Sequence, residues 1–237
     1  MSGFFGSGNQ GPVGALRVEV RPLMRMVYTW MTVGLLITAV VALSITSNPS
    51  LARTVHSSSV MFGAIMLELA LVIGLSFFLQ KLSPFAAAIM FFAYAILNGV
   101  TLSIIFAVYS IGTIQLAFFS AAGTFAAMTV LGYTTELDLS KYRTYLYMGL
   151  IGLLVAGLVN MLLRSSGLDL FISMGGVILF TVLTAYDTQK IKRLAANPEI
   201  QDDGSLLMKI SIIGALTLYL DFVNLFLYLL RLFGSRR

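Results

Sequence analysis

Three carboxylates interrupt long apolar segments of the sequence, and they are the residues best placed to do chemistry. Glu68 lies in M-L-E-L-A-L-V-I, Asp187 in T-A-Y-D-T-Q-K and Asp221 in Y-L-D-F-V-N. A charged side chain in hydrocarbon costs about 2.5–3.5 kcal/mol even on the mildest insertion scale. Such residues normally face the interior of a helix bundle, where they pair with a partner or take part in ion or proton movement.

Asp221 has the clearest polar surroundings. Polar and small residues recur around it at steps of three or four, which places them on one face of a helix. We predict that this face lines a cavity at the core of a bundle; the alternative is a hydrogen-bond network that only joins helices. The polar face consists of Ser211, Gly214, Thr217, Asp221, Asn224, Tyr228 and Arg231.

Asp187 lies closer to the end of its apolar segment, one turn after Thr184. Its position is equally consistent with an acid at the membrane–water boundary. On a straight helix that rises 1.5 Å per residue, it lies only about 6 Å inside from Ile191. The same estimate puts Asp221 about 16 Å inside from Ile210. Spacing alone therefore does not bring the two carboxylates together.

Two weaker signals lie on the second and third apolar segments. Glu68 fits a functional and a structural role equally well. Lys81 ends the same segment and is a possible counter-ion for Asp187, although a lysine there also reaches the headgroups by snorkelling. Tyr94, Asn98 and Thr101 form a smaller polar patch on the third segment.

The composition indicates that a helical membrane bundle positions these residues. Of 237 residues, 58% are hydrophobic and 11% are charged, against about 25% charged in soluble domains. Seven segments are close to or above the roughly 20 apolar residues that span a bilayer. We therefore predict an all-α, polytopic membrane protein with a seven-helix transmembrane bundle. The predicted spans are Met26–Thr46, Ser58–Leu79, Pro84–Tyr109, Ile114–Tyr133, Tyr145–Leu163, Leu170–Ile191 and Ile210–Phe233.

We predict one transmembrane domain over residues 23–234. Residues 1–22 are polar and are expected to be disordered, and residues 235–237 form a short basic end. On the fifth span, Gly149, Gly152, Ala156 and Asn160 form a face of small residues, which predicts close helix packing.

The basic residues predict the orientation. With the N-terminus in the cytoplasm, ten of the fifteen Lys and Arg residues fall on the inner side. This positive-inside bias favours a cytoplasmic N-terminus and a periplasmic C-terminus. The basic C-terminal end leaves one alternative, a re-entrant last segment that returns the C-terminus to the cytoplasm.

Several function classes are disfavoured. The chain has no cysteine, and its single histidine, His56, falls in a predicted outer loop, which argues against thiolate and histidine metal sites and Ser–His catalysis. No glycine-rich phosphate loop is present. We expect no enzymatic activity and no cofactor. The basic residues flank apolar segments, so anionic lipid explains them better than nucleic acid.

Four stretches of the sequence resemble a known family. They are T-A-Y-D-T-Q-K-I-K, the last-span run G-A-L-T-L-Y-L-D-F-V-N-L-F-L-Y-L-L-R-L-F-G, the loop G-Y-T-T-E-L-D-L-S and the third-span run L-N-G-V-T-L-S. Together they resemble the transmembrane Bax inhibitor motif family over Leu23 to Gly234. The short polar head and the basic end are similar to its bacterial inner-membrane branch.

The resemblance implies a seven-helix bundle with the last helix at its centre and a pH-sensitive calcium leak. The family's aspartate pair, which matches Asp187 and Asp221, would share a proton in the closed state and separate when both ionise. Glu68 matches an acidic position in some members, and a basic residue after span two aligns only loosely with Lys81. The pathway-lining candidates are Glu68, Asn98, Thr184, Thr217, Asn224 and Tyr228, and the candidate calcium ligands are Asp187 and Asp221.

Three functions follow as hypotheses. The first is a passive, pH-gated cation pathway of the inner membrane with calcium favoured, since carboxylate and carbonyl oxygens suit calcium. The second is a regulator that transports nothing and binds a membrane protease or other membrane proteins of quality control. The third is a proton-coupled cation exchanger. The partners expected in every case are the lipid bilayer and, for the first and third, calcium or another cation.

Overall fold

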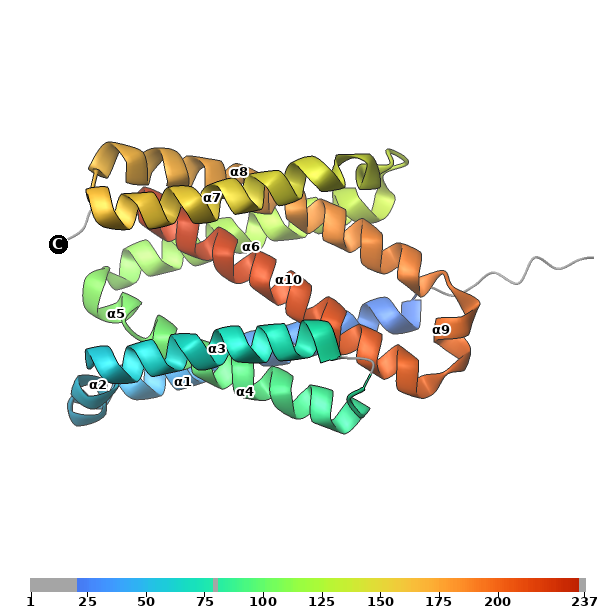
Figure 1. Ribbon diagram of the computed structural model, residues 1–237, viewed down its shortest axis with the longest axis horizontal. Coiled ribbons are helices and arrows are strands. Elements are labelled where there is room, and N and C mark those ends of the chain that lie inside the picture. The colour runs from blue at the N-terminus through green and yellow to red at the C-terminus, as the bar shows by residue number, and fades with distance from the viewer. Residues whose placement is uncertain (1–20, 79–80, 235–237) are drawn as a thin grey trace, which may run out of the picture.

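The chain folds into helices joined by short turns (Figure 1). A computed structural model describes residues 21–78 and 81–234, and no strand occurs among them. The elements are α1 (Arg21–Thr46), α2 (Pro49–Val55), α3 (Ser58–Phe78), α4 (Pro84–Leu102), α5 (Ile105–Val108), α6 (Ile111–Thr134), the 3-10 helix η1 (Leu139–Tyr142), α7 (Arg143–Leu163), α8 (Ser166–Ala195), α9 (Pro198–Asp202) and α10 (Gly204–Phe233).

Seven of these helices are long and apolar enough to cross a membrane, so the predicted count and fold class are confirmed. Their bounds differ from the predicted ones. The sixth and seventh spans each extend over 30 residues, because α8 continues to Ala195 and α10 begins at Gly204. Helix α1 begins at Arg21, inside the segment predicted to be disordered; residues 1–20 and 235–237 lie outside the described part.

The third span is interrupted rather than continuous to Tyr109. Helix α4 ends at Leu102, and the short α5 follows. At the interruption, the Ser103 hydroxyl donates to the Val100 carbonyl and lies 2.9 Å from His56 Nε2. A serine that bonds to nearby backbone competes with the regular helical pattern, which accounts for the break.

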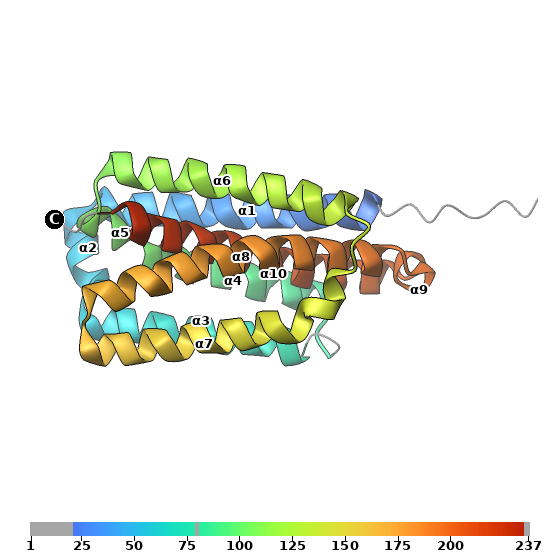
Figure 2. The same cartoon turned by 90° about the horizontal axis from the view of Figure 1, so that it is seen from above.

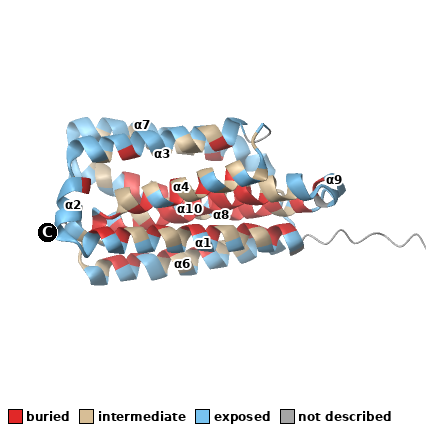
Figure 3. Ribbon diagram, turned by 90° about the horizontal axis from the view of Figure 1, so that it is seen from below, coloured by how far each residue is buried: buried red, intermediate tan, exposed pale blue. Residues whose placement is uncertain are grey.

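The helices lie in three layers, seen edge-on in Figure 2. Helices α1 and α6 form one outer layer, α3 and α7 the other, and α4, α8 and α10 lie between them. In the most apolar 18-residue stretch of α10, 67% is buried, against 11% in the corresponding stretch of α3 and 6% in that of α7 (Figure 3). The last helix is therefore the centre of the bundle, as the resemblance implied.

Glycines mark the closest contacts between helices. A side chain at Gly132 on α6 would meet the backbone of Ala185 on α8, and one at Gly99 on α4 would meet Thr38 and Val41 on α1. The predicted small-residue contact on the fifth span is only partly present. Gly149 contacts Leu179, but a Cβ on Gly152 would meet nothing within 4 Å, because α7 lies at the edge of the bundle.

Candidate functional site

Asp187 and Asp221 are both buried where α8 packs along α10. Their exposed fractions are 7% and 4%. The two carboxyl groups are close enough for their charges to interact. The depth estimate from the sequence assumed that the sixth span ends at Ile191 and the seventh begins at Ile210 at the same depth in the membrane. The structure removes that conflict, since α8 continues beyond Ile191, α10 starts before Ile210, and the two helices lie against each other.

The cation beside this pair is Lys190, not the predicted Lys81. Lys190 Nζ lies 3.9 Å from Asp187 Oδ1, and the lysine side chain is 49% exposed. Both residues project from the same turn of α8, because they are three positions apart. Lys81 follows α3, and its ammonium lies 6.0 Å from the ring centroid of Phe78. Lys190 shares its helix with Asp187, whereas the predicted counter-ion lies after α3.

Asp221 itself is only partly satisfied by the protein. Its Oδ2 atom is buried and has no hydrogen-bond partner among the described residues. A buried oxygen without a partner costs roughly 1–3 kcal/mol, more when it is charged. Water, a proton or a cation at this atom would offset that cost.

The residues of the predicted polar face of α10 differ in how far they are buried. Ser211, Gly214 and Asp221 are buried, whereas Thr217 and Asn224 are partly exposed. The Thr217 hydroxyl donates to Ile213 (2.9 Å) and the Asn224 amide donates to Leu220 (2.8 Å), both carbonyls of the same helix. These groups satisfy themselves along the helix rather than binding other helices, so the face is not simply a set of interhelical hydrogen bonds.

Two other pathway-lining candidates lie along the α8–α10 contact. Thr184 is fully buried on α8 and donates to the Phe180 carbonyl at 2.7 Å. Tyr228 is stacked on the Phe180 ring, with centroids 5.8 Å apart, and its ring lies against Gly176. An aromatic stack therefore occupies the α8–α10 contact two turns beyond Asp221.

Glu68 and Asn98 belong to a second polar cluster, separate from the aspartates. The Tyr219 hydroxyl donates to Asn98 Oδ1 (2.9 Å) and lies 2.7 Å from Thr38 Oγ1. The Thr101 hydroxyl donates to Glu68 Oε1 at 2.8 Å. This cluster joins α1, α3, α4 and α10. Sequence reasoning missed Tyr219 because it lies on the side of α10 that reads as apolar.

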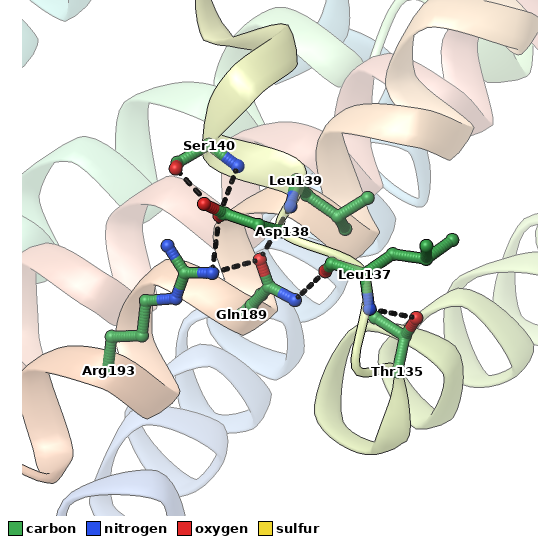
Figure 4. Close-up of polar contacts among 7 residues, drawn as sticks. All are labelled: Thr135, Leu137, Asp138, Leu139, Ser140, Gln189 and Arg193. Atoms are coloured by element: carbon green, nitrogen blue, oxygen red, sulfur yellow. Dashed lines mark hydrogen bonds and ion pairs between the residues drawn. The ribbon is translucent and has the colours of Figure 1, made fainter.

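A third polar group fixes the loop before α7 to α8 (Figure 4). The Gln189 amide donates to the Leu137 carbonyl (2.7 Å), and its oxygen accepts from the Leu139 N–H (2.9 Å). Arg193 donates to Asp138 at 2.5 Å and to Gln189 at 3.0 Å. We call Asp138, Gln189 and Arg193, with the backbone of Leu137 and Leu139, the loop clamp.

The loop clamp explains the charge state of Asp138, which lies outside the spans. Hydrogen bonds from Ser140 and then Arg193 hold the pKa of Asp138 at about 2, below its usual range. Gln189 lies in T-A-Y-D-T-Q-K and Asp138 in G-Y-T-T-E-L-D-L-S, two of the stretches that carry the family resemblance.

The described residues contain no cluster of three or more His, Cys, Asp or Glu side chains that could hold a metal ion. Calcium usually takes six to eight oxygen ligands. Asp187 and Asp221 alone therefore do not make a resident calcium site from side chains, and calcium is considered below only as a transported ion.

Comparison with known proteins identifies the family. A family model described as inhibitor of apoptosis-promoting Bax1 matches residues 20–237. The chain is 47% identical over 222 residues to the inner membrane protein YbhL of Escherichia coli (strain K12), covering 93% of this chain and 94% of the relative. It is 46% identical over 212 residues to a protein of Borreliella burgdorferi, covering 89% and 90%. The relative in Escherichia coli is an inner membrane protein by name, and this chain has seven apolar helices of spanning length. This chain therefore belongs to the Bax inhibitor family of polytopic membrane proteins.

Proposed function

We propose that this protein is a pH-sensitive, passive cation leak pathway in the membrane, with calcium as the favoured ion. The observation that carries the proposal is the burial of Asp187 and Asp221 together at the contact of α8 with the central helix α10. Two carboxyl groups in one buried site, beside a half-exposed lysine, are a costly arrangement for a purely structural bundle.

The chemistry of the pair supplies a gate. When the two carboxyl groups share one proton, a hydrogen bond joins α8 to α10. When both ionise, two like charges at short distance repel strongly in a medium of low dielectric constant. Separation of α8 from α10 relieves that repulsion and admits water and cations. The leak therefore increases as pH rises through the ionisation of the pair.

Cation passage fits the remaining features of the site. Carboxylate oxygens are hard ligands that suit calcium, and a set of only two allows an ion to leave again. Lys190 limits the net negative charge near Asp187 in the closed state. The partly exposed Thr217 and Asn224 flank Asp221 on the polar face of α10, one turn before it and one turn after it.

Calcium flux into sealed proteoliposomes that contain the full chain tests the proposal. The wild type should show flux that rises with pH without an imposed proton gradient. Asp221→Asn and Asp187→Asn should each remove the pH dependence, because asparagine keeps the shape but cannot ionise. Asp221→Glu should keep a pH-dependent leak with a shifted midpoint. Asp202→Asn, at an exposed acid on α9, is the matched control and should behave like the wild type.

Each alternative gives a different result. Flux that requires a proton gradient would show that the protein is a proton-coupled exchanger and not a passive leak. Absence of flux from well-folded wild-type protein would favour the non-transporting regulator. If both asparagine variants fold and titrate like the wild type, the pair is structural and the proposed gate is wrong.

A further inference from the structure

A large cavity lies at the end of the bundle where α7 ends, α8 begins and α10 ends. Its volume is about 1100 Å³, which is at or above the range of about 300–1,000 Å³ for ordinary small-molecule sites. It is separate from the aspartate pair, which does not line it. A site of this size at the end of membrane-spanning helices can hold a headgroup together with the upper part of an acyl chain.

One wall of the cavity is apolar and belongs to α7. Leu154, Leu158 and Met161 line it and are 62%, 62% and 68% exposed. Gly157 lies in the same wall, and a Cβ there would meet nothing within 4 Å. Because α7 packs mainly on α8, no other described helix covers this surface. Apolar side chains at this depth fit hydrocarbon better than water.

The polar end of the cavity carries two arginines. Arg164 ends α7 in a left-handed conformation, with φ of 51°. Arg231 lies in the last turn of α10, with its guanidinium 5.6 Å from the ring centroid of Tyr228. A guanidinium beside an aromatic ring keeps its N–H groups, which can donate two parallel hydrogen bonds to a phosphate.

The charges of the lining favour one negative charge on the ligand. Asp169 also lines the cavity, in the first turn of α8, where a carboxylate is favourable to the helix dipole. Among the lining residues that the structure describes, two arginines and one aspartate leave a net charge of +1. A free anion would satisfy the arginines but would leave the apolar wall unused.

We propose that this cavity binds one anionic phospholipid, with its phosphodiester between Arg164 and Arg231 and an acyl chain along Leu154, Leu158 and Met161. The site binds lipid whether or not the aspartate pair gates ions. It recognises the phosphodiester of a lipid with one net negative charge, for which phosphatidylglycerol is a suitable probe.

The test is native mass spectrometry of the full chain, delipidated in detergent and titrated with phosphatidylglycerol. Phosphatidylcholine of the same chain length and inorganic phosphate are the competing ligands. We expect one phosphatidylglycerol to bind preferentially. The double variant Arg164→Gln with Arg231→Gln should weaken phosphatidylglycerol binding at least about tenfold, because it removes the charged hydrogen bonds to the phosphodiester.

Two further variants separate a specific loss of lipid binding from a loss caused by misfolding. Arg53→Gln removes an exposed arginine on α2, at the same end of the bundle (Figure 1), and should leave binding unchanged. Gly157→Phe keeps both arginines but fills the apolar part of the cavity, and should weaken phosphatidylglycerol binding as well.

Several outcomes would overturn the proposal. Equal binding of phosphatidylcholine and phosphatidylglycerol would mean that the arginines do not recognise the headgroup. An equal loss in Arg53→Gln would indicate general surface charge. Displacement of the lipid by inorganic phosphate, with no effect of Gly157→Phe, would leave only an anion site. No flux is measured in any arm, so these outcomes do not depend on the proposed leak.

Discussion

Asp221 and Tyr219 lie two positions apart on α10 and therefore point to opposite sides of the helix. Asp221 lies close enough to Asp187 on α8 for their charges to interact, whereas the Tyr219 hydroxyl reaches Asn98 on α4 and Thr38 on α1. The central helix thus carries one polar residue that is costly and titratable, and another that is neutral and fully bonded. The first suits a gate, and the second suits a fixed contact that keeps α10 in place.

Tyr219→Phe tests the fixed contact. Phenylalanine keeps the ring, which is fully buried, but removes the hydroxyl and leaves the buried Asn98 oxygen without its donor. We expect a loss of roughly 1–3 kcal/mol in stability, the usual cost of an unsatisfied buried polar group. Thermal unfolding of the purified protein in one detergent, followed by circular dichroism, measures the change.

The matched control is Tyr145→Phe, at a tyrosine on α7 that is 71% exposed. Its loss should be small, because water replaces the hydroxyl's contacts. Equal unfolding temperatures for the two variants would mean that the cluster of Thr38, Asn98 and Tyr219 contributes nothing to stability.

At the scale of elements, the C-terminal part of α8 does two things at once. Asp187 is buried near Asp221 of α10, while Gln189 and Arg193, four positions apart, hold the loop that leads to α7. Lys192 adds a hydrogen bond to the Tyr133 carbonyl at the end of α6 (2.6 Å). Any movement of α8 that separates the aspartates must therefore carry this loop or break its contacts.

Asp138→Asn weakens the loop clamp without touching the aspartate pair. The folded pKa of Asp138 is about 2, below the roughly 3.9 of a free aspartate. A lowered pKa means that the carboxylate's contacts stabilise the fold above about pH 4 and are lost only as the pH falls towards 2. Relative to the wild type at the same pH, the variant should therefore raise the amide hydrogen-exchange rate of residues 135–140 by the same factor at pH 6 and at pH 8.

Glu136→Gln is the control, because Glu136 is an exposed acid in the same loop. In the flux assay, Asp138→Asn should change the size of the leak but not its midpoint pH. A shifted midpoint near neutral pH would show that Asp138, and not only the buried pair, contributes to the pH response.

At the scale of the whole molecule, the charges predict how the bundle sits in the membrane. The short helix α2 lies at the end of the bundle where α10 ends, and α9 lies at the opposite end (Figure 1). The positive-inside bias predicts that α9 lies in the cytoplasm and α2 in the periplasm. The lipid site proposed above would then lie in the outer leaflet.

Because the chain has no cysteine, single cysteines can test this orientation directly. Ser50→Cys on α2 and Glu199→Cys on α9 both replace exposed residues. In intact spheroplasts, a membrane-impermeant thiol reagent should label the first and should reach the second only after lysis. The reverse labelling would invert the orientation, and labelling of both in intact spheroplasts would contradict the predicted seven-span topology.

The sequence by itself determined the properties that depend on local pattern. Hydropathy over about 20 residues gave the seven spans, because a helix in hydrocarbon must satisfy its own backbone and expose apolar side chains. The burial of Asp221 followed in the same way, from a polar face of helical period within an apolar segment. The break at Ser103 and the longer α8 and α10 were missed because helix ends depend on side-chain contacts and on loops that hydropathy does not register.

Only the tertiary structure decided which residues meet. It placed Asp187 beside Asp221, gave Asp187 the neighbour Lys190 rather than Lys81, joined Tyr219 to Asn98, and left a cavity between Arg164 and Arg231. The stagger and packing of helices arise from the fit of many side chains along their full length, and a small change in stagger alters every partner. Periodicity in one chain specifies which face of a helix is polar, but not which helix lies opposite that face.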